Sequence, residues 1–314
     1  MELSVGSLFA GIGGIDIAFQ QAGFNIKWAI ENDSACCRTY RHNFSDINLI
    51  EKDIHLVNPS ELEPVDILVA GFPCQAFSIG GLQRGFEDKR GNLFFEIQKF
   101  IEYNEPRFVF LENVPNLIEH DNGNTFNRIH NALSELNYTI RYKVMRASEY
   151  GGVPQIRDRI YIVAFRDDEE CELFSFPEKI ELTTSIEEVL QRNVEKHVVY
   201  YYDKEHPFYS KANNIVNRKD SIYRVYHESI KCTQNQMCPT LTASMGTRAN
   251  QVHLVRDNYG IRKLTINECL RFQGFPANFR FPNTITLNGA YKQCGNSVVV
   301  PVIRRIAEQI QKLL

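Results

Sequence analysis

Residues 65–78 read Val65-Asp66-Ile67-Leu68-Val69-Ala70-Gly71-Phe72-Pro73-Cys74-Gln75-Ala76-Phe77-Ser78, an apolar run that stops at a glycine and a proline and leads to a cysteine. An apolar run of this length, bounded by Gly and Pro, is typical of a buried strand. Because ligands of open α/β sheets bind beyond the carboxyl ends of such strands, Cys74 lies where chemistry is expected. Pro73 fixes its own φ and restricts Phe72, so the thiol follows a stiff turn. A buried structural cysteine is the alternative interpretation.

The composition is that of an ordinary soluble globular protein, with 43% hydrophobic and 23% charged residues. The 314 residues suffice for one large domain, or for a large domain with a smaller companion. The first twenty residues lack a basic start followed by a long apolar run, so we expect neither a signal peptide nor a membrane span. The eight cysteines form no C-x-x-C pair, which argues against a zinc site and against a disulfide framework.

Charge is unevenly distributed along the chain. From Gly246 to Leu314 there are ten Lys or Arg and three Asp or Glu, a net of +7, so the remainder carries −10 of the total of −3. Such an asymmetry is expected where one part of a chain faces a polyanion. A basic face that merely balances an acidic one explains it equally well.

A glycine-rich turn near the N-terminus predicts a nucleotide-binding βαβ unit. A short strand at 4–9 is followed by the turn 10–14 and a helical pattern. The next strand, 26–30, ends in Glu31, where an acid can accept hydrogen bonds from ribose hydroxyls. A further acid, Asp53, follows the apolar run 47–50. Because Asp16 stands where a dinucleotide pattern needs a small residue, a nucleoside ligand without phosphates is favoured.

Charged residues adjoin two further predicted strands. Glu112 directly follows the strand 108–111, and would share one crevice with Cys74 if the two strands are neighbours; an ordinary surface glutamate is the alternative. In the strand 155–165, Arg157 and Arg159 are two apart and therefore point to the same face. Their guanidinium groups suit a phosphate or a base carbonyl, although pairing with neighbouring acids would also explain them.

Two segments without regular periodicity carry chemistry of their own. Residues 79–91 form a glycine-rich, basic loop beside Cys74, suited to closing over a substrate or serving as a solvated connection. Beyond Pro177 the periodic runs become short, which indicates a domain boundary. There, residues 238–250 are small, hydrogen-bonding and Arg-bearing, suited to reading base edges or to an ordinary connection.

Taken together, these motifs resemble those of the DNA (cytosine-5) methyltransferases of bacterial restriction-modification systems. The resemblance covers essentially the whole chain, and the motifs are specific in combination, order and spacing. They are Phe9-Ala-Gly-Ile-Gly-Gly14, Gly71-Phe-Pro-Cys-Gln-Ala-Phe-Ser78, Glu112-Asn-Val114, Gln155-x-Arg157-x-Arg159, the block Arg262–Pro276 and Gly295-Asn-Ser-Val298.

The resemblance implies an α/β fold, a Rossmann-like S-adenosylmethionine-dependent methyltransferase sheet with a smaller, mostly irregular or β target-recognition domain. We accordingly expect a catalytic and cofactor-binding domain at 1–185, a target-recognition domain at 186–267, a hinge segment at 268–295, and a C-terminal helix at 296–314 that returns to the catalytic domain.

The resemblance also implies an activity: transfer of a methyl group from S-adenosylmethionine to carbon 5 of a flipped-out cytosine in a specific double-stranded DNA sequence. Cys74 would form a covalent adduct at carbon 6. Glu112 would hold ring nitrogen 3 and the exocyclic amine, Arg159 would approach the base carbonyl, and Arg157 would support the site. S-Adenosylhomocysteine would be the product, and no metal is implied.

The binding residues implied by the resemblance fall into two sets. The cofactor set is Phe9, Ala10, Gly11, Ile12, Gly13, Gly14, Glu31, Asn32, Asp53, Ile54, Phe72, Pro73, Leu93, Asn296 and Ser297. The DNA set is Gln75, Ser78, Arg84, Arg90, Thr240, Ser244, Thr247, Arg248 and Asn250.

Three alternatives remain. A tRNA (cytosine-5) methyltransferase would carry a Cys-Phe-Thr signature, where this chain has Lys231-Cys232-Thr233-Gln234. A catalytically inactive relative would lack Cys74 or Glu112, and a nucleotide-dependent dehydrogenase would leave the Cys74 stretch unexplained. For the methyltransferase we expect a bacterial cytoplasmic monomer without a membrane partner; a cognate restriction endonuclease acting on the same site without a stable complex is compatible with this interpretation.

Overall fold

A computed structural model describes residues 3–72, 93–206, 208–226, 229–233, 236–246 and 251–314. The chain divides into two compact units. Unit 1 comprises Met1–Arg146, Asp158–Glu178 and Val300–Leu314, and unit 2 comprises Ala147–Arg157 and Lys179–Val299. No helix within the described ranges is long and apolar enough to cross a membrane.

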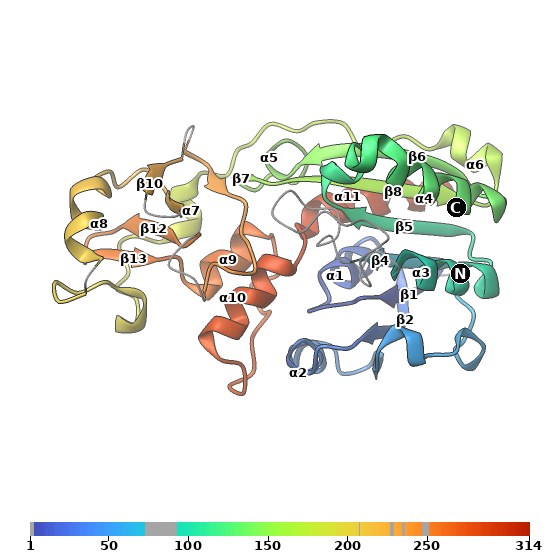
Figure 1. The fold of residues 1–314 in the computed structure, drawn as a ribbon, viewed down its shortest axis with the longest axis horizontal. Coiled ribbons are helices and arrows are strands. Elements are labelled where there is room, and N and C mark those ends of the chain that lie inside the picture. The colour runs from blue at the N-terminus through green and yellow to red at the C-terminus, as the bar shows by residue number, and fades with distance from the viewer. Residues whose placement is uncertain (1–2, 73–92, 207, 227–228, 234–235, 247–250) are drawn as a thin grey trace. The chain divides into compact units, whose positions relative to one another are not determined.

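Unit 1 is built on a mostly parallel sheet. Within the described ranges its seven strands lie in the order β3-β2-β1-β4-β5-β8-β6 (Figure 1). The pairs from β3 to β5 are parallel, whereas β8 runs antiparallel to both of its neighbours. The strands are β1 (Ser4–Leu8), β2 (Asn25–Glu31), β3 (Asn48–Glu51), β4 (Ile67–Gly71), β5 (Phe108–Asn113), β6 (Thr139–Arg146) and β8 (Asp158–Phe165).

The strand order reverses between β1 and β4. The chain moves from β1 to β2 and β3 on one side, and then crosses to β4 and β5 on the other. In such sheets the crevice beyond the carboxyl ends of the two strands at the reversal is the usual ligand site. The glycine turn follows β1, and β4 precedes the Cys74 stretch in the sequence, so both predicted motifs are next in sequence to the two strands at the reversal.

Helices cover both faces of the sheet because every central strand is apolar on both sides. One face packs against α3 (Leu93–Asn104) and α4 (Asn124–Glu135), with Phe94, Ile97 and Ile129 buried in the same core as Leu68 and Val109. On the other, Phe19 of α1 (Gly14–Gln21) packs edge-on against Phe110, and α11 (Val300–Gln311) packs against α1. The remaining helices of this unit are α2 (Ser34–Asn43) and α6 (Asp168–Leu173). This confirms the predicted α/β fold class.

The sequence predicts one continuous strand at 155–165, and this prediction is wrong in one respect. It is divided at Arg157 into β7 (Gln155–Ile156), which pairs with β11 (Cys238–Pro239) in unit 2, and β8 in unit 1. The physical reason is the guanidinium of Arg157, which is 3% exposed and donates to backbone carbonyls of unit 2. Alternation of apolar residues alone gives no sign of this break.

Unit 2 contains an antiparallel sheet of order β10-β9-β12-β13 in its described part. Ala212, Val225 and Leu254 lie in its hydrophobic core. The strands are β9 (Tyr223–Tyr226), β10 (Ser229–Cys232), β12 (His253–Arg256) and β13 (Ile261–Lys263). The helices are α5 (Ala147–Tyr150), α7 (Ile186–Leu190), α8 (Tyr209–Ile215), α9 (Ile266–Phe272) and α10 (Leu287–Asn296).

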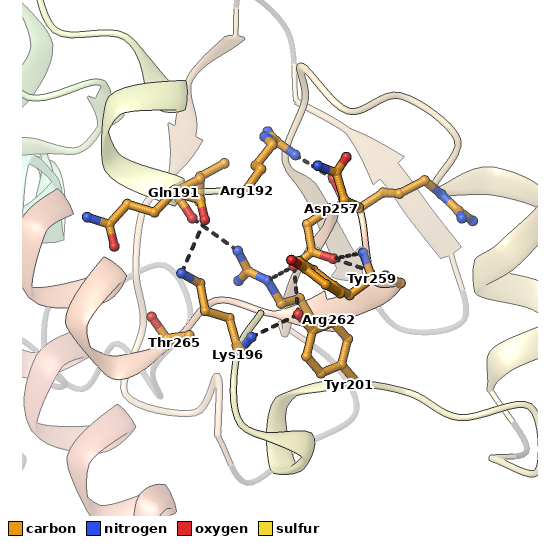
Figure 2. Close-up of polar contacts among 12 residues, drawn as sticks. Gln191, Arg192, Lys196, Tyr201, Asp257, Tyr259, Arg262 and Thr265 are labelled. Atoms are coloured by element: carbon orange, nitrogen blue, oxygen red, sulfur yellow. Dashed lines mark hydrogen bonds and ion pairs between the residues drawn. The ribbon is translucent and has the colours of Figure 1, made fainter. Parts of the chain in front are cut away.

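A buried ion network joins β13 to α9 in unit 2. Figure 2 shows its residues Arg262, Asp257 and Tyr201. Arg262 is fully buried; its Nε lies 2.6 Å from Oδ2 of Asp257, and its two terminal nitrogens lie 2.7 and 2.8 Å from the oxygens of Glu268. Glu268 also completes the capping box of α9 with Thr265. Tyr201 donates to Asp257 at 2.9 Å, which extends the network to a third segment.

Candidate active site

The predicted nucleophile Cys74 lies outside the described residues, as do Pro73, Gln75, Ser78, Arg84, Arg90, Thr247, Arg248 and Asn250. The chain that leads to Cys74 is described as far as Phe72. Gly71 ends β4 and pairs with Glu112 of β5. A Cβ at Gly71 would lie 3.2 Å from Ile15 and 3.7 Å from Oε2 of Glu112, so a small residue is needed here.

Glu112 and Arg159 form an ion pair at the end of β5. Nε of Arg159 lies 3.0 Å from Oε1 of Glu112, and both side chains are largely buried. The pair lacks hydrogen-bond geometry, so Oε1 of Glu112 is a buried oxygen with no hydrogen-bond donor among the residues that the structure describes. A buried carboxylate oxygen in this state favours a ligand with an N–H donor.

Arg157 has different surroundings from Arg159. Its guanidinium donates to the carbonyl oxygens of Leu241 at 3.0 Å and Gly295 at 3.4 Å, and also to that of Ser297. These contacts all lie within unit 2 and join the end of β7 to the segment after β11 and to the end of α10. They are the contacts of a residue that fixes backbone positions.

The glycine turn after β1 adopts backbone conformations that favour glycine. Gly11 has a φ of 59° and Gly13 a φ of 83°. A Cβ at Gly13 would lie 2.3 Å from the ring of Phe44, whereas a Cβ at Gly11 would have the carbonyl oxygen of Phe9, 4.0 Å away, as its nearest neighbour. The turn is therefore tightly packed beneath Gly13 and open at Gly11, as a turn that lets a ligand approach the backbone must be.

Glu31 organises this turn from the end of β2. Its Oε2 accepts from the backbone N–H of Gly11 at 2.8 Å, and its Oε1 accepts from those of Asn32 and Asp33, each at 2.8 Å. An ionised carboxylate has about four lone-pair sites, so about one remains for a ligand hydroxyl. Together with the open position at Gly11, this acceptor fits a nucleoside ribose.

The other predicted cofactor residues of unit 1 surround the same strand ends. Phe9 and Leu93 are half-buried against the core that contains Ile54 and Phe72. Asp53 lies in the loop after β3, where its hydrogen bond from His55 lowers the pKa of the carboxyl group below its ordinary value. Apolar surfaces beside carboxylates suit an adenine ring and its amino group.

Asp16 is a buried acid whose burial the sequence interpretation did not anticipate. It is 0% exposed, in the first turn of α1 directly after the glycine turn. Burial raises the pKa of its carboxyl group to about 6, against the opposing influence of the nearby Ser7 and Tyr40 hydroxyls. Neither hydroxyl makes a hydrogen bond of good geometry to the carboxylate. The available sequence signal was an acid among the apolar positions of a helix.

A family model described as "C-5 cytosine-specific DNA methylase" matches residues 3–312 of the chain. The chain belongs to the C-5 cytosine-specific DNA methylase family. The methylase is therefore an enzyme of the DNA (cytosine-5-)-methyltransferase class, as the sequence predicted, and a methyltransferase of this kind uses S-adenosylmethionine-dependent chemistry.

Two curated relatives cover the methylase almost completely. It is 44% identical over 313 residues to the Type II methyltransferase M.Bsp6I of Bacillus sp. (strain RFL6), with 99% of each chain covered. It is 36% identical to the Type II methyltransferase M.HhaI of Haemophilus parahaemolyticus, with 96% of this chain and 92% of that one covered.

Solved structures share the fold of the methylase at lower identity. A crystal structure of a Spodoptera frugiperda DNMT2 mutant has a TM-score of 0.75 at 20% identity, covering 99% of this chain and 100% of that one. A putative DNA modification methyltransferase encoded within a prophage (E. coli) has a TM-score of 0.73 at 24% identity, with 99% of each covered. At these identities the likeness concerns the fold alone.

The predicted residues of unit 2 occupy the ends of elements. Asn296 is the last residue of α10, and Ser297 follows it as the C-cap. Thr240 donates to the carbonyl of Ile156 at 2.6 Å, and Ser244 donates to Gln251. Gln251 was absent from the predicted DNA set, because an amide residue beside a small polar segment carries no distinctive sequence pattern.

Proposed function

We propose that the methylase transfers a methyl group from S-adenosylmethionine to carbon 5 of a cytosine flipped out of a specific double-stranded DNA sequence, by way of a covalent Cys74 adduct. The observation that carries the proposal is the buried Glu112–Arg159 pair beside Gly71, three residues before Cys74 in the sequence. A carboxylate oxygen lacking a hydrogen-bond donor and a guanidinium match the amino group and the carbonyl of cytosine.

Each of the predicted catalytic residues would have its own role in the reaction. The Cys74 thiolate adds to carbon 6, forming a C–S bond and moving electron density toward carbon 5. Glu112 accepts from the exocyclic amine and holds a proton at ring nitrogen 3, while Arg159 donates to the carbonyl oxygen. Carbon 5 would then take the methyl group that S-adenosylmethionine supplies, with S-adenosylhomocysteine as the leaving group. Loss of the carbon 5 proton to a base, release of the proton at nitrogen 3 and breaking of the C–S bond would restore the aromatic ring and the thiolate.

The cofactor would lie over the glycine turn, where Glu31 accepts from the ribose and Asp53 from the adenine amine. S-Adenosylmethionine supplies an electrophilic methyl group when bound. Phe9, Leu93 and Phe72 would contact its apolar parts, and the family resemblance also assigns Asn296 and Ser297 to the cofactor. The open position at Gly11 supports this assignment, because a side chain there would occupy the space of the ligand.

A cytosine within a duplex must leave the base stack before it can react, at a cost of a few kcal/mol. We expect the DNA-binding residues of the Cys74 loop and of residues 240–250 to contribute contacts that offset this cost. The basic C-terminal region would neutralise phosphates, which makes binding salt-dependent. As in the Type II relatives, the activity would serve restriction-modification, with the enzyme acting as a cytoplasmic monomer and any cognate endonuclease recognising the same site separately.

The test begins with methylation of unmethylated plasmid and of tRNA by the purified protein with labelled S-adenosylmethionine. We expect label in the plasmid, and bisulfite sequencing then maps the target. A duplex carrying 5-fluorocytosine at the mapped position should trap a covalent complex, because fluorine cannot leave as a proton does. Label in tRNA alone would contradict the proposal.

Two cysteine variants complete the test. Cys74→Ala should abolish both turnover and trapping while retaining specific DNA binding. Cys232→Ala removes an exposed cysteine and is the matched control, for which unchanged turnover and trapping are expected. Trapping by the Cys74 variant would show that the nucleophile lies elsewhere.

A further inference from the structure

The segment Thr242–Gly246 of unit 2 is held at both of its ends. Leu241 and Met245 are buried, whereas Thr242 and Ser244 are half-buried and carry hydroxyl groups. The backbone N–H of Met245 donates to the carbonyl of Thr242 at 3.1 Å, which closes a tight turn.

Helix α10 packs directly against this turn. A Cβ at Gly295 would lie 2.1–2.3 Å from backbone atoms of Thr242 and Ala243, and a Cβ at Gly246 would lie 2.8 Å from Cβ of Tyr291. The backbone of the turn and helix α10 are therefore in direct contact, with no room for a further carbon atom at Gly295 or at Gly246. The turn cannot move toward α10, so its polar groups keep fixed positions.

Gln251 fixes the two hydroxyl groups of the turn. Its Oε1 accepts from Oγ1 of Thr242 at 2.8 Å and also from Oγ of Ser244. Gln251 has a φ of 88°, and its backbone N–H donates to the carbonyl oxygen of Val225 in β9 at 2.6 Å. Few residues other than glycine adopt a positive φ, and the backbone hydrogen bond ties Gln251 to the sheet. Gln251 is therefore a rigid support for the turn.

The hydrogen bonds to Gln251 determine where the hydrogens of the two hydroxyl groups point. A hydroxyl has one hydrogen to donate and two lone pairs that accept. Because Thr242 and Ser244 both donate to Gln251, each can offer only lone pairs to a ligand. In the major groove, acceptors recognise the exocyclic amino groups of adenine and cytosine and do not match N7 and O6 of guanine, which are themselves acceptors.

We propose that Gln251 is a specificity-positioning residue: its carboxamide oxygen holds the Thr242 and Ser244 hydroxyls as acceptors for the amino group of an adenine or a cytosine in the DNA target. This inference rests on the proposed function, since it requires that this part of unit 2 faces DNA. It extends that function by naming the class of base that the turn recognises.

The experiment compares methylation rates on the mapped target with rates on duplexes changed at one base pair. A mismatch at a contacted position lowers the wild-type rate roughly five- to 150-fold. Gln251→Met removes the acceptor at nearly constant size and frees both hydroxyl hydrogens. We expect its discrimination to fall below about fivefold at one position and to stay at the wild-type level at the other positions of the target.

A conservative variant separates positioning from general stability. In Gln251→Glu the side chain ends in two acceptor oxygens, so Thr242 and Ser244 must still donate to it. We expect this variant to discriminate between base pairs as the wild type does. Its added charge weakens all substrates alike and cancels in the ratio of rates. Thr242→Val and Ser244→Ala each remove one acceptor, and we expect reduced discrimination at the same base-pair position as for Gln251→Met.

Gln236→Met is the matched control, because Gln236 is an exposed glutamine of the same unit that also has positive φ, 50°. It should retain wild-type discrimination. The inference is overturned if folded Gln251→Met discriminates as the wild type does, or if Gln251→Glu loses discrimination. Failure of the proposed function would appear earlier and differently, as absence of sequence-specific DNA methylation by the wild-type enzyme.

Discussion

Arg159 and Glu112 lie 3.0 Å apart on the adjacent strands β8 and β5, at the end of the sheet where Gly71 begins the approach to Cys74. Glu112 is 8% exposed. A buried carboxylate is costly unless it is paired, and the guanidinium of Arg159 is the partner that Glu112 has in this site.

Substitution Glu112→Gln should lower the methylation rate by a factor of about 10² to 10⁴, because the neutral amide no longer offsets charge on the cytosine ring as the adduct forms. Single-turnover methylation of the mapped duplex measures this. Specific DNA binding should change far less than the rate.

Asp158→Asn is the control for the loss of an ion pair, and it lies on β8, the strand that carries Arg159. Asp158 pairs with Arg146 at 2.7 Å, and both side chains are more than a third exposed. We expect a change below about 1 kcal/mol in the free energy of unfolding and an unchanged methylation rate. Equal losses in the two variants would mean that Glu112 acts only through the fold.

The network around Arg262 predicts a large loss of stability. Arg262→Met leaves the carboxylates of Asp257 and Glu268 buried without their cation, which costs about 3–5 kcal/mol of the free energy of unfolding. Urea unfolding of the full chain, followed by fluorescence, measures the loss. Arg218→Met breaks the exposed pair with Asp220 and should leave the free energy of unfolding almost unchanged, because solvent screens this pair. Similar losses in both variants would contradict the special role of the network.

Much of unit 1 could be predicted from sequence because its strands are buried on both faces. Continuous apolar runs such as 67–70 and 108–111 have few other interpretations; Glu112 directly follows the second run, and Cys74 comes four residues after the first. The order of the strands could not be derived from these patterns. It depends on which apolar faces pack together.

Unit 2 was harder to predict for a physical reason. Its strands are short, and its interior includes buried polar contacts such as that of Arg262 with Glu268, which leave no periodic pattern. Arg157 illustrates the same limit. Its spacing from Arg159 indicated a shared face, whereas its contacts with backbone carbonyls depend on residues 84 to 140 positions away.

The buried carboxyl group of Asp16 predicts a pH-dependent stability. Its pKa is about 6 in the folded chain against 3.8 ordinarily, so the folded state binds the proton more tightly. That stabilisation is present at acidic pH and is lost as the pH rises toward 6 and beyond, by about 3 kcal/mol in total. Asp16→Asn stays neutral and should be more stable than the wild type at pH 7, with the difference vanishing near pH 4.

Urea unfolding of both proteins across this pH range measures the difference. Asp46→Asn, in an exposed loop, is the control and should follow the wild type. A wild-type protein that gains stability over Asp16→Asn as the pH rises would show that the carboxylate is stabilised in the fold.

Glu31 supplies the last prediction, which concerns the cofactor. Glu31→Gln keeps one acceptor oxygen but replaces the other with an amide that cannot accept from the backbone N–H groups now bound to it. Hydrogen bonds to a charged group contribute about 1.5–3 kcal/mol, so we expect the dissociation constant for S-adenosylmethionine to rise roughly tenfold or more. Calorimetric titration measures this directly. Glu51→Gln changes the residue that pairs with Glu31 on β3 and should leave cofactor affinity unchanged. If both variants bind the cofactor as the wild type does, Glu31 serves the turn alone and the ribose must be held by other groups.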